Sequence, residues 1–376
     1  MLNRIKAIAL KEIRQLKRDT RMLFVLFVFP LLLLVIFGYA INFDVHHIKM
    51  VVLDQDKSFD SRDFINSLTS SSYFDLVGYI EDENKIKEIL DKKEAQCVIV
   101  FPKDMSRQLY ANQKVKIQIL IDGVDGNTAT VIQNYFNYAV QSYSQKFISN
   151  VLAVKGIKSY VPIDLEPVFW FNPDLSSTFF LIPGLIAMIL IITAVVSISL
   201  SIVREKERGT IEQINVSPLS SFEMLIGKTI PYIIISLLIT IVILAAGYIL
   251  FQIPIKGNYL LLLITTLLFI FASLNLGIFV SSISQTQQVA FQMATIISML
   301  PSTILSGFIF PIESMPVPIQ WLTNITPSKF FLIILRDILL KGVGLEAFWQ
   351  QVLYLILFSA ILLGLSTIIN KRSKVA

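Results

Sequence analysis

Several short fragments of the chain combine residue types that bind phosphate or metal ions. The run 226–229, Ile-Gly-Lys-Thr, resembles the end of a phosphate-binding loop, in which a lysine contacts the phosphates. The first glycine of that motif would fall at position 222, where the chain has Phe222. The run also enters a long apolar stretch that is suited to a membrane span. We therefore expect no nucleotide site at this position.

Two carboxylates follow the apolar run at 51–53 and could take part in phosphoryl or calcium chemistry. Asp54 and Asp56 stand at the end of an expected strand, an arrangement that phosphoaspartate hydrolases use. The same spacing opens a calcium loop, but Phe59 and Ile65 occupy the positions where that loop needs Gly and Glu. A polar turn after an edge strand is the simpler interpretation.

Other candidate metal ligands are isolated. Asp122, Asp125 and Asn127 lie near two glycines, and turn-forming residues that lead into a helix account for them without a metal ion. The two histidines are adjacent at 46–47, and the single cysteine, Cys97, cannot form an intramolecular disulfide or complete a zinc site. No nucleophile, base and orienting group can be assembled. The sequence thus predicts a chain that is not an enzyme and holds no cofactor or metal of its own.

The stretch 204–220 concentrates charge between two long apolar runs. Its first five residues are all charged, Gly209 interrupts them, and a short amphipathic helix is expected to begin at Thr210 and to end before Pro218. One interpretation is a loop whose charges only fix the orientation of the chain in a membrane. The acidic residues weaken that interpretation, because Lys and Arg alone set orientation. We favour a rigid segment to which a soluble partner binds.

The elements that would position this stretch are membrane spans. The chain has 376 residues, of which 54% are hydrophobic and 16% charged, whereas soluble domains have about 25% charged residues. The apolar residues gather in runs near the ~20 residues that a helix needs to cross ~30 Å of hydrocarbon. Six spans without Asp, Glu, Lys, Arg or His are expected at 22–41, 178–203, 229–253, 259–282, 289–310 and 350–369.

Basic residues flank these spans at their expected cytoplasmic ends. They lie in 1–21 before the first span, in 204–208 after the second and in 371–374 after the last. The positive-inside rule places all three groups in the cytoplasm, and an even number of spans then puts both termini there. The net charge of +5 is therefore assigned to topology and not to nucleic-acid binding. Within 1–21, apolar and basic residues take opposite faces at helical spacing, which predicts an amphipathic helix in the headgroup plane.

Two polar segments fall on the other side of the membrane. The segment 42–177 alternates strand-like and helical patterns, which predicts an α/β domain whose strand order stays open. The segment 311–349 contains a helix, expected from Thr326 to Gly342, that is too short to cross and should lie on or dip into the outer leaflet. The expected strands are 50–54, 73–80, 95–101 and 115–121, and the expected helices are 60–70, 82–93, 103–111 and 127–154.

The expected fold is thus an α-helical polytopic membrane protein with six transmembrane helices and an inserted extracytoplasmic α/β domain. Its spans lack the carboxylates, histidines and paired charges that ion-coupled transporters need. A transporter of this kind would have to draw its energy from a partner. Two alternatives stay open: a membrane-anchored envelope receptor or scaffold whose external domain binds a partner without transport, and a self-sufficient channel or carrier, which the apolar spans disfavour.

Three motifs occur in order along the chain. The first is Arg204-Glu205-Lys206-Glu207-Arg208-Gly209-Thr210-Ile211-Glu212, followed by Pro218. The second is Phe171-Asn172-Pro173, just before the second span, and the third runs from Gly307 to Pro316 and includes Pro311, Glu313, Ser314 and Met315. Together they resemble the permease subunits of type-2 ABC exporters, in the subgroup with a large external domain between the first two spans.

The resemblance implies a multi-pass protein of the inner (cytoplasmic) membrane that pairs with a second permease and exports a drug or a lipophilic, lipid-like compound. Separate ABC ATPase subunits would hold ATP and Mg²⁺ and would contact the segment 204–216 as a coupling helix, with 1–21 as a connecting helix. Membrane lipid is a further partner, nucleic acid is not, and an envelope with two membranes could add a periplasmic adaptor. The residues implied in ATPase coupling are Arg204, Glu205, Glu207, Arg208, Gly209, Thr210, Glu212 and Pro218. Those implied in an external gate are Gly307, Pro311, Glu313, Ser314, Met315 and Pro316.

Overall fold

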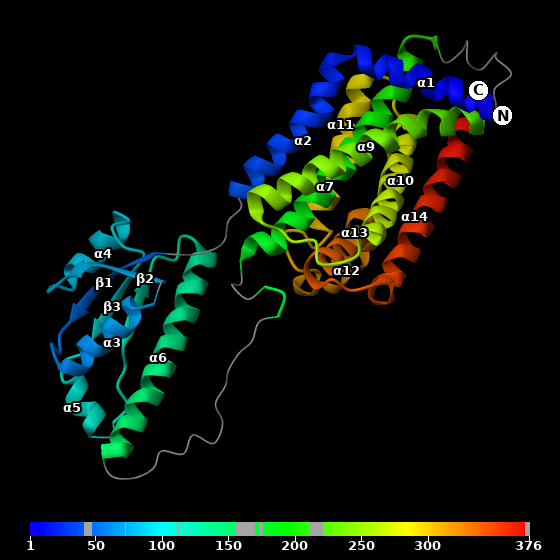
Figure 1. The fold of residues 1–376 in the computed structure, drawn as a ribbon. Helices are drawn as coiled ribbons and strands as arrows, with labels where there is room; N and C mark the ends of the chain where they lie inside the picture. Colours follow the sequence, from blue (N-terminus) through cyan, green and yellow to red (C-terminus); the bar gives the residue numbers. More distant parts are fainter. Residues whose placement is uncertain are drawn as a thin grey trace. The chain divides into compact units, whose positions relative to one another are not determined.

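The chain folds into two compact units (Figure 1). The computed structural model describes residues 1–40, 47–71, 73–111, 113–154, 170–172, 176–210 and 221–372. The helical unit comprises Met1–Asn42 and Val168–Ala376, and the sheet unit comprises Phe43–Pro167. The helical unit is therefore built from both ends of the chain, while the sheet unit is one continuous segment.

The helical unit contains one short surface helix, several long apolar helices and a group of short helices. Their bounds are α1 (Leu2–Arg18), α2 (Thr20–Ala40), α7 (Ser177–Glu207), α9 (Ser221–Phe251), α10 (Tyr259–Ile283), α11 (Gln287–Ile304), α12 (Val317–Leu322), α13 (Pro327–Arg336) and α14 (Leu345–Arg372). A π-helical turn, Asp337–Lys341, extends α13 to Gly342, the residue at which the sequence predicts the end of this helix.

Five helices within the described ranges are long and apolar enough to cross a membrane: Met22–Ala40, Ser177–Glu207, Glu223–Phe251, Tyr259–Ile283 and Leu345–Ile369. The protein is thus a helical polytopic membrane protein. The sixth predicted span, 289–310, corresponds to α11, which has 18 residues and includes glutamines at 287, 288 and 292. Length and composition therefore support five spans in this part of the chain, and α11 is a more polar helix than its neighbours.

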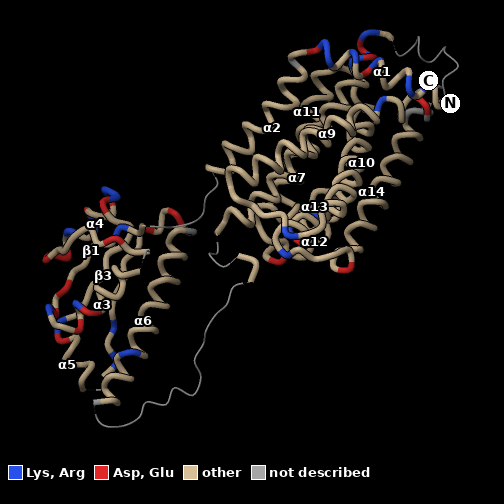
Figure 2. Tube along the Cα trace, in the orientation of Figure 1, with Lys and Arg blue, Asp and Glu red and all other residues tan. Residues whose placement is uncertain are grey.

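Helix α7 is the centre of the helical unit. In its most apolar stretch 89% of the residues are buried, because α2, α9, α10, α11 and α13 all pack against it. Figure 1 shows α1 across one end of these helices, where the last turns of α7 and the first turns of α9 also lie. Lys, Arg, Asp and Glu residues gather at that end and are sparse along the helices (Figure 2). We call it the charged end of the bundle.

The sheet unit contains four strands in the order β2-β1-β3-β4. The strands are β1 (Ile48–Asp54), β2 (Phe74–Tyr79), β3 (Cys97–Phe101) and β4 (Gln118–Ile121). β1 pairs in parallel with β2 and β3, and β4 adds to β3 in antiparallel orientation. Every strand begins and ends within three residues of its expected position, whereas the strand order could not be inferred from the sequence.

Helices cover both faces of this sheet. One face packs on α3 (Phe59–Thr69), α5 (Met105–Tyr110) and α6 (Gly126–Val154), with Phe64, Phe101 and Phe136 among the buried side chains. The other face packs on α4 (Asn84–Asp91), where Ile86 contacts the strand residues that point away from the first core. Alternate residues of β1 and β3 therefore serve two separate apolar cores, as the two-residue period of a strand requires.

Candidate coupling site at the charged end of the helix bundle

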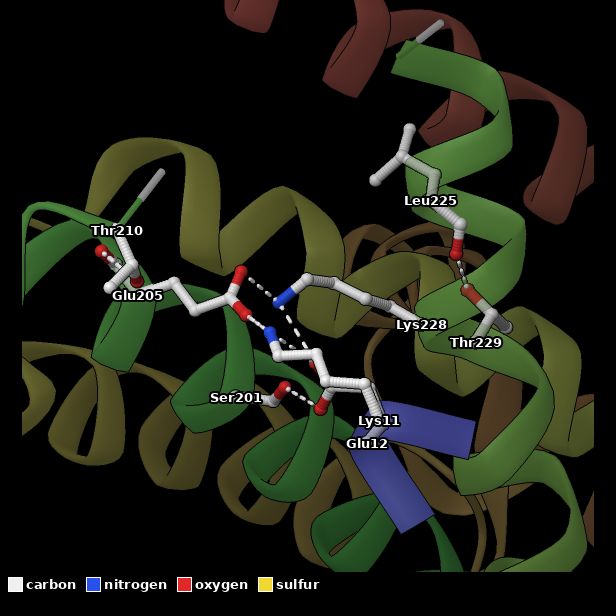
Figure 3. Close-up of polar contacts among 8 residues, drawn as sticks. All are labelled: Lys11, Glu12, Ser201, Glu205, Thr210, Leu225, Lys228 and Thr229. Atoms are coloured by element: carbon white, nitrogen blue, oxygen red, sulfur yellow. Dashed lines mark hydrogen bonds and ion pairs between the residues drawn. The ribbon is translucent and has the colours of Figure 1, made fainter. Parts of the chain in front are cut away.

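Four buried or half-buried charges meet at the charged end and join three helices (Figure 3). Lys228 of α9 lies 2.5 Å from a carboxylate oxygen of Glu205 in α7 and 3.5 Å from one of Glu12 in α1. Lys11 of α1 pairs with both carboxylates, at 3.5 Å in the case of Glu12. Ser201 donates a hydrogen bond of 3.0 Å to Glu12. We refer to Lys11, Glu12, Glu205 and Lys228 as the ionic cluster.

The ionic cluster is balanced in charge and is shielded from solvent. Lys228, Glu12 and Glu205 are 1%, 3% and 4% exposed. Lys11 covers them from outside and keeps about half of its own side chain exposed. Burial alone would lower the pKa of Lys11, but the hydrogen bond and charge of Glu205, together with Glu12, raise it above its ordinary value. Lys11 therefore remains an ammonium, and two cations face two carboxylates.

The close approach of α1 to α9 explains the glycine that precedes Lys228. A Cβ atom on Gly227 would lie 2.8 Å from Cβ of Ile8 and 3.2 Å from the carbonyl oxygen of Ile5. Only glycine lets the two helices meet at this distance. The run 226–229, which resembles part of a phosphate-binding loop, thus places its glycine in a helix contact and its lysine in the ionic cluster.

The four charged residues at the end of α7 together contact several neighbouring segments. Successive residues of an α-helix are ~100° apart, so four in a row point in all directions around the axis. Because α7 is the central helix, each direction meets another helix. The contacts are Arg204 with Asp19 (2.9 Å) and Gln287 (3.3 Å), Glu205 with Lys11 and Lys228, Lys206 with the carbonyl of Ser281, and Glu207 with Gln287.

These contacts connect α7 to nearly every element at the charged end. Asp19 lies between α1 and α2, where it also accepts a hydrogen bond of 3.0 Å from the backbone of Met22. Gln287 is the first residue of α11, and Ser281 lies in the last turn of α10. A movement of α1 would therefore reach α7, α9 and α11 through charged contacts and not through apolar packing alone.

Gly209 ends α7 and sets the direction in which the chain leaves it. Its φ angle is +70°, in the left-handed region that glycine adopts without strain. Its amide donates to the carbonyl of Lys206 at 3.1 Å, and the Thr210 hydroxyl donates to the carbonyl of Glu205 at 3.2 Å. These bonds satisfy the last carbonyls of the helix. Arg208, the residue before Gly209, is exposed.

A second charged contact closes the opposite end of the helical unit. Arg336, the last residue of α13, donates hydrogen bonds to the carbonyls of Phe180 (2.9 Å) and Gly307 (3.1 Å). Its guanidinium also lies over the Phe180 ring, 4.0 Å from the centroid. One side chain thus fastens the start of α7 to the turn that follows α11.

Comparison with known proteins agrees with this architecture. The family model described as ABC-2 family transporter protein matches residues 20–368. The chain belongs to the ABC-2 transporter family. It is 33% identical to the probable multidrug ABC transporter permease YbhS of Escherichia coli (strain K12), over 98% of this chain and 97% of that protein. Identity to the probable multidrug ABC transporter permease YbhR of the same strain is 31%, over 96% of both chains.

A more distant relative is the inner membrane transport permease YhhJ of the same strain, which is 28% identical over 94% of this chain and 93% of that protein. The resemblance to type-2 ABC permeases inferred from three short motifs is thereby confirmed over nearly the whole chain. The protein is a permease subunit of a transporter and a multi-pass membrane protein.

The permease positions the residues implied in coupling in two different ways. Arg204, Glu205 and Glu207 direct their side chains to neighbouring helices of the same chain, while Arg208 faces outward. Glu212 and Pro218 fall within 211–220, outside the described residues. The sequence analysis assigned no coupling or fastening role to Glu12, Lys228 or Arg336. For Lys228 the sequence does contain a signal, because this lysine directly precedes an apolar run.

The residues implied in an external gate form a compact turn in the permease. Gly307 supplies a carbonyl to Arg336, and a 3₁₀ turn, Ile312–Ser314, carries Glu313 and Ser314. Pro316 directly precedes α12. In Phe171-Asn172-Pro173, the Asn172 side chain accepts from the Ser176 amide (3.0 Å) and donates to the Ser176 carbonyl (2.9 Å), which fixes the chain just before α7.

The carboxylates that resemble metal or phosphate sites are occupied by local hydrogen bonds. Asp54 accepts from the amides of Asp56 and Lys57 and, at 2.7 Å, from the hydroxyl of Ser61. His47 lies 3.0 Å from Asp75. Among the described residues no group of three His, Cys, Asp or Glu side chains is arranged to hold a metal ion.

Proposed function

We propose that this permease is the membrane subunit of an ATP-driven exporter, and that a separate ATPase operates it through the charged end. The observation that supports this proposal is the set of contacts at the end of α7. Four consecutive charged residues join α7 to α1, α9, α10 and α11. A helix bundle that only needed an anchor would have no reason to bury the charges of Glu12, Glu205 and Lys228 at one end, because burial of charge costs free energy.

In this proposal the charged end faces the cytoplasm, with both termini, and the protein lies in the inner membrane. The basic face of α1 satisfies the positive-inside rule. The ATPase would contact the segment that leaves α7 at Gly209, together with α1, and the ionic cluster would carry the displacement into the bundle. ATP and Mg²⁺ would be bound by the ATPase and not by this chain.

A second permease would complete the path, and α11 is the helix that we assign to the contact. Gln288 and Gln292, one turn apart, are both exposed, and Met299 continues the same face. Amide side chains that face lipid are unfavourable, whereas a facing helix or a water-filled path satisfies them. α11 would then be the sixth spanning helix. The names of the relatives suggest drugs as cargo, and a lipophilic compound is the class that we propose.

The test is a comparison of transport and ATP hydrolysis in reconstituted vesicles that contain the permease and its ATPase. Glu207→Gln removes the charge that binds Gln287 and leaves the buried cluster intact. Because this hydrogen bond is exposed, its loss is worth at most about 1 kcal/mol, so transport per ATP hydrolysed should fall up to about fivefold. Glu346→Gln, at an exposed position in the first turn of α14, is the matched control.

Two outcomes would refute the proposal. One is normal transport per ATP in Glu207→Gln. The other is cargo movement by the permease alone, without nucleotide, which would indicate a channel or carrier. A receptor or scaffold, the alternative that the sequence leaves open, predicts instead that no ATPase copurifies with the chain and that deletion of 45–170 abolishes its activity.

A further inference from the structure

A groove of about 300 Å³ lies in the sheet unit, between the start of α3, the end of α5 and the C-terminal half of α6. Aromatic rings form much of its wall. Phe59 and Tyr110 are 79% and 66% exposed, which is unusual for side chains of this size. Phe147 meets Tyr110 edge to face, with ring centroids 5.5 Å apart. Tyr143, one turn before Phe147 on the same face of α6, also lines the groove.

Carboxylates complete the groove and give it a negative charge. Asp60 is 7% exposed and accepts a hydrogen bond from Ser106, while Asp63 keeps 40% of its side chain exposed. The single cation among the described residues that line the groove is Lys146, whose ammonium lies 3.9 Å from Asp63. Two carboxylates therefore face one ammonium. Burial raises the pKa of the Tyr143 phenol, and the charges of Asp63 and Asp60 raise it further.

We propose that this groove binds an organic cation with an aromatic or aliphatic body. The face of an aromatic ring attracts a cation, most strongly one that is weakly hydrated. The carboxylates would repel an anion, and a neutral apolar ligand would cover them without compensating their charge. The volume is at the lower end of the range of ~300–1,000 Å³ for small-molecule sites, so the ligand is small. Binding at this groove requires neither ATP nor an ATPase, and it therefore stands apart from the coupling proposal.

The experiment measures binding of radiolabelled benzyltrimethylammonium to the full-length protein in nanodiscs of zwitterionic lipid, without nucleotide. Tetramethylammonium, which lacks a ring, and benzyl alcohol, which lacks a charge, serve as competitors. We expect saturable binding that each competitor displaces only at higher concentration. Since a partly exposed ion pair contributes up to ~1 kcal/mol, Asp63→Asn should weaken binding about fivefold.

Lys146→Gln should act in the opposite direction and tighten binding, because it leaves both carboxylates free to face the ligand. These opposite effects distinguish a binding site from a structural contact. If the Lys146–Asp63 ion pair only held the fold together, either substitution would break it and would change binding in the same direction. Asp91→Asn is the control: it makes the same charge change at an exposed position of α4, on the other face of the sheet. The absence of saturable binding would overturn the proposal. Equal shifts in Asp63→Asn and Asp91→Asn, or shifts of the same sign in Asp63→Asn and Lys146→Gln, would also overturn it.

Discussion

Replacement of Lys228 by methionine removes one of the two ammonium groups of the ionic cluster. Glu12 and Glu205, 3% and 4% exposed, would then share Lys11 alone. A buried charge that loses its partner destabilises a protein by ~3–5 kcal/mol. Because methionine has nearly the shape of the lysine stem, this loss reflects charge and not a cavity.

The charge argument also predicts a rescue. Glu12→Gln in the same chain removes the excess carboxylate and leaves the pair Lys11–Glu205 intact, while the amide oxygen introduced at position 12 can still accept from Ser201. The double variant Glu12→Gln/Lys228→Met should therefore be more stable than Lys228→Met alone. Residues that share a network show coupling energies of ~0.5–3 kcal/mol, and a buried charge pair should fall at the upper end of that range.

Thermal unfolding followed by tryptophan fluorescence tests this prediction. The three tryptophans, Trp170, Trp321 and Trp349, all belong to the helical unit, so the signal reports on the part of the chain that contains the cluster. A loss of ~3 kcal/mol lowers Tm by about 6–12 °C at ~2–4 °C per kcal/mol. A Tm of Lys228→Met within about 2 °C of that of the unmodified protein would refute the reasoning, as would a double variant that is less stable than both single variants.

Two further predictions concern Arg336 and Cys97. Arg336→Lys keeps a charge but loses the planar guanidinium that stacks on the Phe180 ring. We expect this change to cost about 1–2 kcal/mol in thermal unfolding, and no change in Tm would contradict the fastening role. Burial raises the pKa of Cys97 from 9.0 to about 12. Since the folded state then holds its proton more tightly than the unfolded state, Cys97 contributes stability below pH 9 that is lost as the pH rises towards 12. Unfolding monitored between these pH values should show that loss of stability in the unmodified protein and a smaller loss in Cys97→Ala. The Cys97 thiol of the folded protein should also react slowly with an alkylating reagent. Equal pH dependence of stability in both proteins would refute the raised pKa of Cys97.

The elements of the fold follow from local patterns in the sequence. Apolar runs predict the spanning helices, and the alternation of strand and helix patterns predicts the strands of the sheet unit within three residues. Strand order depends on contacts between distant segments, such as the parallel pairing of Met50 with Cys97, and no local pattern specifies these contacts. The sixth predicted span, 289–310, differs from the observed helix for another reason. The apolar pattern in the sequence extends to residue 310, but α11 ends at Ile304, and its glutamines make it less apolar than the other long helices.

The candidate site was only half predictable. The charged residues 204–208 stand out in the sequence, and their placement at a helix end follows from Gly209. Their partners carry no local signal of this role. Glu12 is the single carboxylate of α1, but its sequence neighbours do not show what it pairs with, and Lys228 lies next to an apolar run in a fragment that resembles a phosphate-binding loop. Only the packing of α1 against α9 at Gly227 brings these two side chains together. Arg336 was missed for the same reason, since its carbonyl partners lie 156 and 29 residues away.

The strength of the ionic cluster decides how α1 can move relative to α7. Energetic coupling between distant sites is typically ~1–3 kcal/mol, whereas separation of a buried charge from its partners costs ~3–5 kcal/mol. A displacement of α1 that broke its contacts with Glu205 and Lys228 would therefore consume more free energy than such coupling delivers. It follows that α1, the end of α7 and the start of α9 should move together as one rigid group, and that bending should occur farther along the helices, where their contacts are mainly apolar.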